Sequence, residues 1–331
     1  MRLRLVIAAG LISLAAGFVA AQGMYAQVGD IVIGGPLPAQ WDYLLADSAG
    51  KRLYVSHSSE VVVIDTATNK VIGRIEDTPG VHGMAVGVGK VFTSNGRENK
   101  VSIVDPKTLA TSSKVETGGA NPDAIVFEPV KKEVWAFNHT GHSAAEIDAT
   151  TGKLVATIPL SGTAETGQPD AAGTRIFVNI EDKEAVDVID VATKKVVATW
   201  SVAPGGGPTG MAVDHATKRL FIGADKLMVM MDYTNGKVVA SVPICAGTDA
   251  TWYDAGAKIA FSSCRDGKIT AAKVEGDKMT VVQTIETSRN SKTMALDPLT
   301  HKLYVAAANP VAAPGRGNDP NSFHVLVYGV K

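Results

Sequence analysis

The stretch that decides the fold is Arg52–Ile75, which reads RLYVSHSSEVVVIDTATNKVIGRI. It contains two short apolar runs, Leu53–Val55 and Val61–Ile64, separated by a polar turn. A third run, Val71–Ile75, follows after Asp65 and a turn of Thr, Asn and Lys. Short runs rich in β-branched and aromatic residues, bounded by turn residues, are typical of antiparallel strands joined by tight hairpins. The stretch therefore predicts a small meander of strands.

The same pattern recurs along the chain. Similar segments begin at Lys90, Arg175, Arg219 and Lys302. An aspartate marks the same turn in five copies, 40, 43, 42 and 42 residues apart: Asp65, Asp105, Asp148, Asp190 and Asp232. A sixth copy has Lys273 in that place, and a seventh ends at Tyr328. A period near 40 with four strand-like runs is typical of propeller blades, which must stack around an axis to bury their faces. We predict one all-β domain over residues 22–331, a seven-bladed β-propeller of four-stranded antiparallel blades.

The two ends of the repeat array predict how the ring closes. The last repeat supplies runs at Thr293–Leu296, Lys302–Val305 and Phe323–Tyr328, and lacks an outermost strand. The run Val28–Ile33 precedes the first full repeat and has no blade of its own. Exposed strand edges invite aggregation, and pairing these two parts would hide both edges. We expect the N-terminal strand to pair with the last blade.

Two recurring motifs resemble a known family. The second strand of a repeat reads Tyr54-Val55-Ser56-His57 or Phe92-Thr93-Ser94-Asn95, and the third ends in Ile64-Asp65-Thr66 or Ile189-Asp190-Val191. These motifs resemble those of the YVTN-repeat (YncE-like) β-propellers of bacterial extracytoplasmic proteins, over nearly the whole chain after residue 21. The resemblance implies the propeller fold and an exported protein. It implies no particular chemistry, because the motif consists of structural positions.

The N-terminus has the pattern of a signal peptide over residues 1–21. Arg2 and Arg4 precede the apolar run Leu5–Val19, and Val19-Ala20-Ala21 predicts cleavage before Gln22. A membrane anchor is the alternative, but the run is shorter than the roughly 20 residues that a span needs. We expect a periplasmic or secreted monomer without a membrane span. The net charge of −1 argues against nucleic-acid partners, since it provides no basic field.

Two sets of repeated residues are interpreted as structural. The aromatic residues of the second strands are expected to pack blade against blade: Tyr54, Phe92, Trp135, Phe177, Phe221 and Tyr304. The sixth repeat, with Ile259-Ala260-Phe261, is expected to interrupt this column. The recurring aspartates are expected to accept backbone N–H bonds in tight turns rather than to bind ligands.

Alignment of the seven repeats places one residue per blade at the mouth of the central channel. These residues are Asp42, His82, Asp123, Glu165, Thr209, Asp249 and Lys292. A second set of loops reaches the same face and brings His57, Asn95, Arg97, Asn138, His139, His142, Asn179, Asp225, Cys264 and Arg265. Pockets form where loops converge, so we expect a small polar ligand or a protein partner to bind at this face.

Three interpretations of the channel mouth remain open at this point. It binds a ligand or partner without chemistry, as a binding or scaffold module. Alternatively it holds a divalent cation, for which His139 and His142 are candidate ligands. The third interpretation is a lactonase-like hydrolase or lyase, with or without a metal ion. Its catalytic groups would be a histidine paired with a carboxylate, chosen from His82, His139 and His142 and from Asp42, Asp123 and Glu165. A redox-subunit role follows only from the architecture shared with methylamine-dehydrogenase-type heavy chains. The sequence contains no CxxCH, GxSxG, HExxH or Walker A motif.

Two further features lie on the same face. Cys245 and Cys264 are the only cysteines, and an exported chain favours a disulfide between them over a metal-binding or nucleophilic role. The long loop Ala306–Ser322 is rich in Gly, Pro and Asn, and its one basic residue is Arg316. This loop is either a lid or partner contact, or a tolerated insertion.

Overall fold

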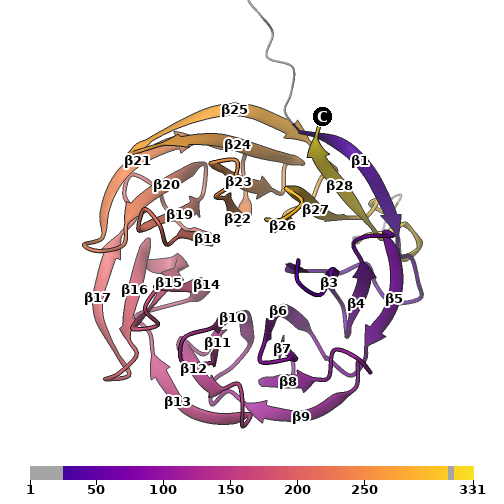
Figure 1. Ribbon diagram of the computed structural model, residues 1–331, viewed down its shortest axis with the longest axis horizontal. Coiled ribbons are helices and arrows are strands. Elements are labelled where there is room, and N and C mark those ends of the chain that lie inside the picture. Colours follow the sequence, from indigo (N-terminus) through magenta and orange to yellow (C-terminus); the bar gives the residue numbers. More distant parts are fainter. Residues whose placement is uncertain (1–24, 312–316) are drawn as a thin grey trace, which may run out of the picture.

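The computed structural model describes residues 25–311 and 317–331. The predicted signal peptide and Arg316 lie outside the described residues. Seven four-stranded antiparallel sheets form a closed ring around a central channel, and helical structure is confined to two short 3-10 turns in the described part of the chain (Figure 1). The predicted seven-bladed propeller is confirmed.

The blades follow one another along the chain, each with its first strand innermost. Blade 1 consists of β2 (Leu44–Asp47), β3 (Arg52–His57), β4 (Glu60–Asp65) and β5 (Lys70–Ile75). Blade 2 consists of β6 (Val81–Gly87), β7 (Lys90–Asn95), β8 (Lys100–Val104) and β9 (Thr111–Glu116). Blade 3 consists of β10 (Pro122–Glu128), β11 (Glu133–Asn138), β12 (Ser143–Asp148) and β13 (Lys153–Pro159).

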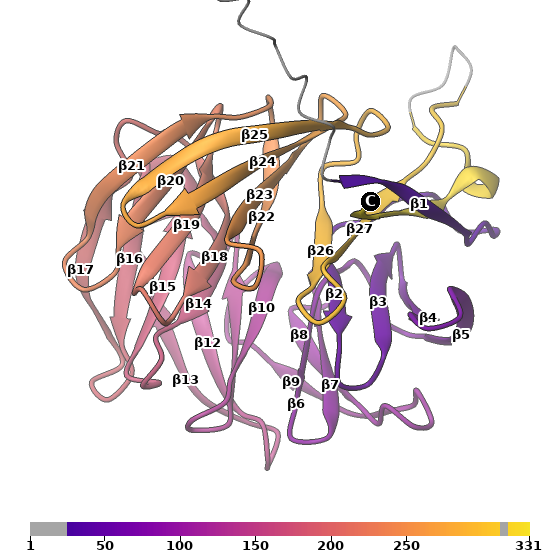
Figure 2. The same cartoon turned by 45° about the horizontal axis from the view of Figure 1, so that its top comes forward.

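The remaining four blades continue the ring, as the tilted view in Figure 2 shows. Blade 4 consists of β14 (Ala164–Pro169), β15 (Arg175–Ile180), the turn η1 (Glu181–Lys183), β16 (Ala185–Asp190) and β17 (Lys195–Ser201). Blade 5 consists of β18 (Pro208–Asp214), β19 (Arg219–Ala224), β20 (Leu227–Asp232) and β21 (Lys237–Pro243). Blade 6 consists of β22 (Thr248–Asp254), β23 (Ile259–Cys264), β24 (Lys268–Glu275) and β25 (Lys278–Glu286). Blade 7 consists of β26 (Met294–Asp297), β27 (Lys302–Ala307), the turn η2 (Pro320–Ser322), β28 (His324–Val330) and β1 (Tyr25–Val32).

The ring closes through the N-terminal strand, as predicted. Strand β1 pairs antiparallel with β28, from Tyr25 opposite Val330 to Val32 opposite His324. The Tyr25 ring packs edge-on against Phe261 of blade 6, with 5.1 Å between ring centroids. The first strand therefore covers the open edge of the last blade and also contacts its neighbour.

The aromatic column runs through all seven blades, which corrects the expected interruption in blade 6. The aromatic residue is the third residue of the second strand in every blade, and Phe261 holds this position in β23. Like the other six, it is fully buried. The sequence alignment missed it because β23 begins with Ile259, whereas the other second strands begin with a charged residue.

The recurring aspartates form turns, as expected. Asp65 Oδ1 accepts hydrogen bonds from the backbone N–H groups of Ala67 (3.0 Å) and Thr68 (2.7 Å). Asp148 accepts equivalent bonds from Thr150 and Thr151. These bonds hold the pKa of the Asp65 carboxyl below its ordinary value. The turns lie at the face opposite the channel mouth, where they close the hairpins between third and fourth strands.

Candidate functional site at the channel mouth

The seven residues predicted for the channel mouth, called here the mouth ring, lie around one rim. His82 Nδ1 donates to Asp42 Oδ2 (2.7 Å), and Lys292 Nζ donates to Asp42 Oδ1 (2.9 Å). Lys292 Nζ also lies 2.5 Å from Asp249 Oδ2. Thr209 Oγ1 donates to the backbone carbonyl of Thr248, next to Asp249 (3.0 Å). Residues about 40 positions apart in sequence thus share one network.

A β-bulge helps to direct the ring residues into the channel. In blades 2 to 6 the ring residue is the second residue of the innermost strand, and the strand register shifts at that point, as between Val81 and Met84 in blade 2. A bulge bends its strand and reorients the side chain next to it, which is why bulges recur beside functional sites. The local backbone irregularity is therefore repeated where the polar residues gather.

Polar side chains on the second strands fix the backbone of the mouth ring. Ser56 Oγ accepts from Asp42 N (2.7 Å), and Ser263 Oγ donates to the Lys292 carbonyl (2.7 Å). The Asn179 amide donates to the carbonyl of Thr209 (2.9 Å). Each of these side chains satisfies a backbone polar group of a mouth-ring residue. The second strands therefore fix the backbone positions of the mouth ring.

Every member of the mouth ring except His82 lines a cavity of about 640 Å³. Its wall is formed by Asp42, Tyr43, Asp123, His139, Glu165, Glu181, Glu184, Gly206, Gly207, Thr209, Asp225, Gly247, Thr248, Asp249, Arg265 and Lys292. Seven of these residues are carboxylates, whereas the permanent cations are Arg265 and Lys292. Arg265 lies 3.4 Å from Asp249, which already contacts Lys292. The cavity is therefore strongly acidic.

The Lys292 ammonium pairs with carboxylates of the protein itself. Burial disfavours its charged form, but the carboxylates of Asp42 and Asp249 outweigh burial and raise its pKa. Burial likewise opposes ionisation of Asp42, yet Lys292 and His82 hold the pKa of Asp42 below its ordinary value. Asp42 and Lys292 thus form a stable ion pair in one wall of the cavity.

Asp123 is in the opposite situation. The residue is 8% exposed, and its Oδ1 is buried and has no hydrogen-bond partner within residues 25–311 and 317–331. The nearest cationic atom to Oδ1 is His82 Nδ1 at 3.8 Å, which points to Asp42 instead. Burial and the charge of Asp42 raise the pKa of Asp123 to about 7. A residue of the cavity wall thus carries a buried acceptor without a partner in the described chain.

His139 and Glu165 form the third charged unit of the wall. His139 Nδ1 lies 3.2 Å from Glu165 Oε1 and 3.1 Å from the Ala164 carbonyl. The hydrogen bond to Glu165 raises the pKa of His139 to about 9. Burial raises the pKa of Glu165 even though His139 opposes that shift. At neutral pH this imidazole is cationic, and its Nδ1 proton is used within the protein.

Two groups at the mouth bring potential metal-ligand atoms within 4.8 Å of one another: Asp42, His82 and Asp123, and His139, Glu165 and Glu181. In both groups the histidine Nδ1 already donates to a carboxylate. No such group in the described chain includes His142, whose Nε2 lies 3.5 Å from Thr163 Oγ1. Of the two candidate ligands predicted from the sequence, His139 therefore belongs to such a group and His142 does not.

Four residues expected at the mouth are buried within the blades instead. His57, Asn95, Asn138 and Asn179 are fully buried, and none of them lines the cavity. His57 stacks on Phe323 with 4.5 Å between centroids and bonds to Glu60. Arg97 is exposed but does not contribute to the cavity wall. The second strands end in polar residues that stabilise the ring, and the following loops reach the mouth.

Tyr43, Glu181 and Glu184 line the cavity and were not singled out from the sequence. Glu181 and Glu184 follow β15 in the same type of loop that carries His139 after β11, so their spacing was an available signal. Tyr43 directly follows Asp42, and no pattern in the other repeats marks an aromatic residue there. Burial and the nearby carboxylates, Asp123 first among them, raise its pKa well above the ordinary value.

The structure joins Cys245 and Cys264 by a disulfide, with their Cα atoms 5.7 Å apart. It encloses the segment that carries Asp249. Replacing both cysteines with serine is expected to lower the free energy of unfolding by about 3 kcal/mol, since the unfolded chain loses a loop constraint. Denaturant unfolding measures this loss. Two titratable thiols in the unreduced protein would contradict the bond.

Comparisons with known proteins show the propeller architecture. The sequence model of the glutamine cyclotransferase family matches residues 49–176, which include His82, Asp123, His139 and Glu165. The hydrazine synthase structure from Kuenenia stuttgartiensis is similar over 88% of this chain and 96% of that one, with a TM-score of 0.74 and 16% identity. The WD40 repeats of RRP9 are similar over 91% and 97%, with a TM-score of 0.75 and 8% identity. A search among curated proteins finds no match.

The residues that the structure describes contain no helix long and apolar enough to cross a membrane.

Proposed function

We propose that this chain is an exported, YVTN-type propeller that binds a small organic cation, carrying a primary ammonium group, at its channel mouth. The observation that carries this proposal is Asp123, a carboxylate in the cavity wall whose buried Oδ1 has no partner in the described chain. Buried polar atoms in folded proteins are almost always hydrogen-bonded, so an orphaned acceptor marks a place for a donor. The pattern of residues 1–21 supports export.

The charge balance of the cavity supports a cationic ligand. Lys292, Arg265 and His82 lie against Asp42 and Asp249, but no permanent cation of the wall contacts Asp123 or Glu165. An anionic ligand would be repelled by this wall, since like charges in a partly buried site are costly. An ammonium group offers up to three donors, and charge-assisted hydrogen bonds are the strong ones.

An organic ammonium fits the site better than a metal ion does. In both candidate groups the histidine Nδ1 and a carboxylate oxygen, of Asp42 or Glu165, already bond to each other, so this pair is satisfied without an ion. A cavity of about 640 Å³ also lies within the range of small-molecule sites rather than of an ion alone. Binding of a divalent cation without any amine would count against the proposal.

Binding is expected to strengthen as pH rises through 7. The groups that face Asp123 are Asp42, His82, His139 and Glu165. With a pKa of about 7, Asp123 is mostly protonated at pH 5.5 and mostly ionised at pH 8. If the ammonium pairs with the ionised form, its affinity should rise roughly 10- to 30-fold over this range. Titration calorimetry with propylammonium at both pH values measures this change.

The matched variants are Asp123→Asn at the mouth and Asp277→Asn on the opposite face. Asp277 lies in the turn after β24 and its side chain is 59% exposed. Asp123→Asn is expected to weaken propylammonium binding about 10- to 100-fold, the value of a hydrogen bond to a charged group. Asp277→Asn should leave it unchanged. Equal affinities of both variants and the parent, or no binding at all, would overturn the proposal.

A second candidate function is enzymatic, and the family match favours it. In a glutamine cyclotransferase reaction, an amino-terminal amine attacks the side-chain amide of its own glutamine, and ammonia leaves. Such a substrate carries the ammonium group that the cavity suits, and Asp123, with its pKa of about 7, is matched to accept the proton at neutral pH. The assay is ammonia release from a glutaminyl peptide, compared between the parent protein and Asp123→Asn. Tight binding without ammonia release would exclude this candidate and retain the binding function.

A further inference from the structure

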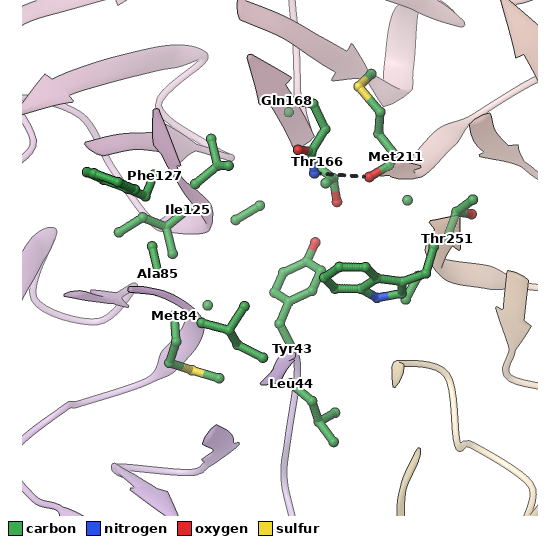
Figure 3. Close-up of a pocket in the computed structure, with 18 of the residues that line it drawn as sticks. Tyr43, Leu44, Met84, Ala85, Ile125, Phe127, Thr166, Gln168, Met211 and Thr251 are labelled. Atoms are coloured by element: carbon green, nitrogen blue, oxygen red, sulfur yellow. Dashed lines mark hydrogen bonds between the residues drawn. The ribbon is translucent and has the colours of Figure 1, made fainter. Parts of the chain in front are cut away.

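A second cavity, of about 280 Å³, lies in the channel directly below the mouth. Its wall is formed by the innermost strands of blades 1 to 6, at positions one to four residues beyond the mouth ring. Because a strand rises about 3.3 Å per residue, this wall extends roughly 10 Å down the channel. Met84, Ile125, Met211 and Trp252 make it largely apolar. Figure 3 shows these strands converging on the cavity.

Tyr43 forms the boundary between the two cavities. It lines both of them, and Figure 3 shows its ring projecting into the middle of the channel. Its neutral phenol, with a pKa held well above the ordinary value by burial and the carboxylates, presents a polar tip and an apolar ring. A group that entered the lower cavity from the mouth would therefore pass an aromatic face.

Most polar side chains of the lower cavity are already satisfied by the protein. Gln168 Nε2 donates to the Met211 carbonyl (3.2 Å), and Thr251 Oγ1 bonds to Ser262 Oγ (2.9 Å). Thr166 Oγ1 is the exception, a buried hydroxyl with no partner in the part of the chain described. The wall thus offers contact to apolar groups and little to charged ones.

We propose that the ligand is amphipathic, with its ammonium group at the acidic mouth and an apolar substituent inserted past Tyr43 into the lower cavity. This inference rests on the proposed function, since it assigns the other end of the same ligand. Charge complementarity fixes the orientation, because the acidic wall lies above and the apolar wall below. A volume of about 280 Å³ equals about nine water-sized volumes, which suits a short alkyl chain or one aromatic ring.

The test is a titration series of methyl-, propyl-, hexyl- and phenethylammonium at pH 8. Affinity is expected to rise about fourfold per methylene group up to the length that fills the cavity, the fold change equivalent to ~0.8 kcal/mol per buried CH₂. Thr166→Leu should fill the cavity and abolish this gain, while methylammonium binding stays unchanged. Thr166→Val keeps the side-chain shape and removes the unpartnered hydroxyl, so it should retain the gain. Thermal unfolding checks that both variants fold.

The outcomes separate the two proposals. If methylammonium binds but chain length has no effect, or if Thr166→Leu binds hexylammonium as the parent does, the lower cavity is not a subsite and the mouth proposal stands. If no ammonium compound binds, the mouth proposal itself fails and this inference fails with it. A chain-length gain that Thr166→Leu removes and Thr166→Val keeps supports both.

Discussion

Replacing Lys292 with methionine is expected to lower the free energy of unfolding by about 3–5 kcal/mol at pH 8. The Lys292 ammonium lies 2.9 Å from Asp42 Oδ1 and 2.5 Å from Asp249 Oδ2, and all three side chains are largely buried. Removing the cation leaves two carboxylates facing one another in a poorly solvated wall. Breaking one partner of a buried network is costly because the remaining charge is uncompensated.

The pH dependence identifies the cause of this loss. In Lys292→Met, Asp42 and Asp249 can relieve their repulsion by taking up protons, so the destabilisation should shrink as pH falls toward 5. Denaturant unfolding at pH 8 and pH 5 measures both values. The control is Lys100→Met, which removes an exposed pair with Glu116 and should cost less than about 1 kcal/mol. An effect of Lys292→Met as small as this control would mean that the network does not stabilise the fold.

The fold could be predicted from the sequence because every blade repeats the same local signals. The turn aspartates, the aromatic column and the incomplete last repeat each follow from short-range patterns, and the blades simply stack. The one error in this layer, Phe261, arose where the charged residue that starts a second strand is replaced by Ile259. A repeat that lacks this charged residue keeps the blade structure but is harder to align with the other repeats.

The candidate site could be predicted only in part. The mouth ring was found because its members share a register position, one per blade. Four polar residues at the ends of second strands were expected at the mouth but are buried: His57, Asn95, Asn138 and Asn179. The sequence does not distinguish a polar strand end that faces the channel from one that supports the wall. Tyr43 was missed because it occurs once, and a repeat alignment is informative only for what recurs.

Replacing Asp123 with asparagine is expected to stabilise the ligand-free protein at pH 8 by as much as about 4 kcal/mol. Burial and the charge of Asp42 raise the pKa of this carboxyl from 3.8 to about 7, so the folded state favours its protonated form. The stability that Asp123 contributes is present below about pH 4, declines as pH rises from 4 to 7, and is absent at pH 8. Asparagine carries no charge and avoids this penalty.

The unfolding temperature of Asp123→Asn should therefore exceed that of the parent by roughly 5 °C at pH 8 and match it near pH 4. Asp277→Asn, the exposed control, should shift it at neither pH. The same Asp123→Asn change weakens ammonium binding, so stability and affinity are expected to move in opposite directions. A residue that serves binding lowers stability and raises affinity, whereas a residue that serves the fold raises stability. Opposite changes in the two quantities therefore identify Asp123 as a binding residue. If Asp123→Asn instead unfolds more easily at pH 8, the carboxylate stabilises the wall, and the assignment of a ligand to its free oxygen is wrong.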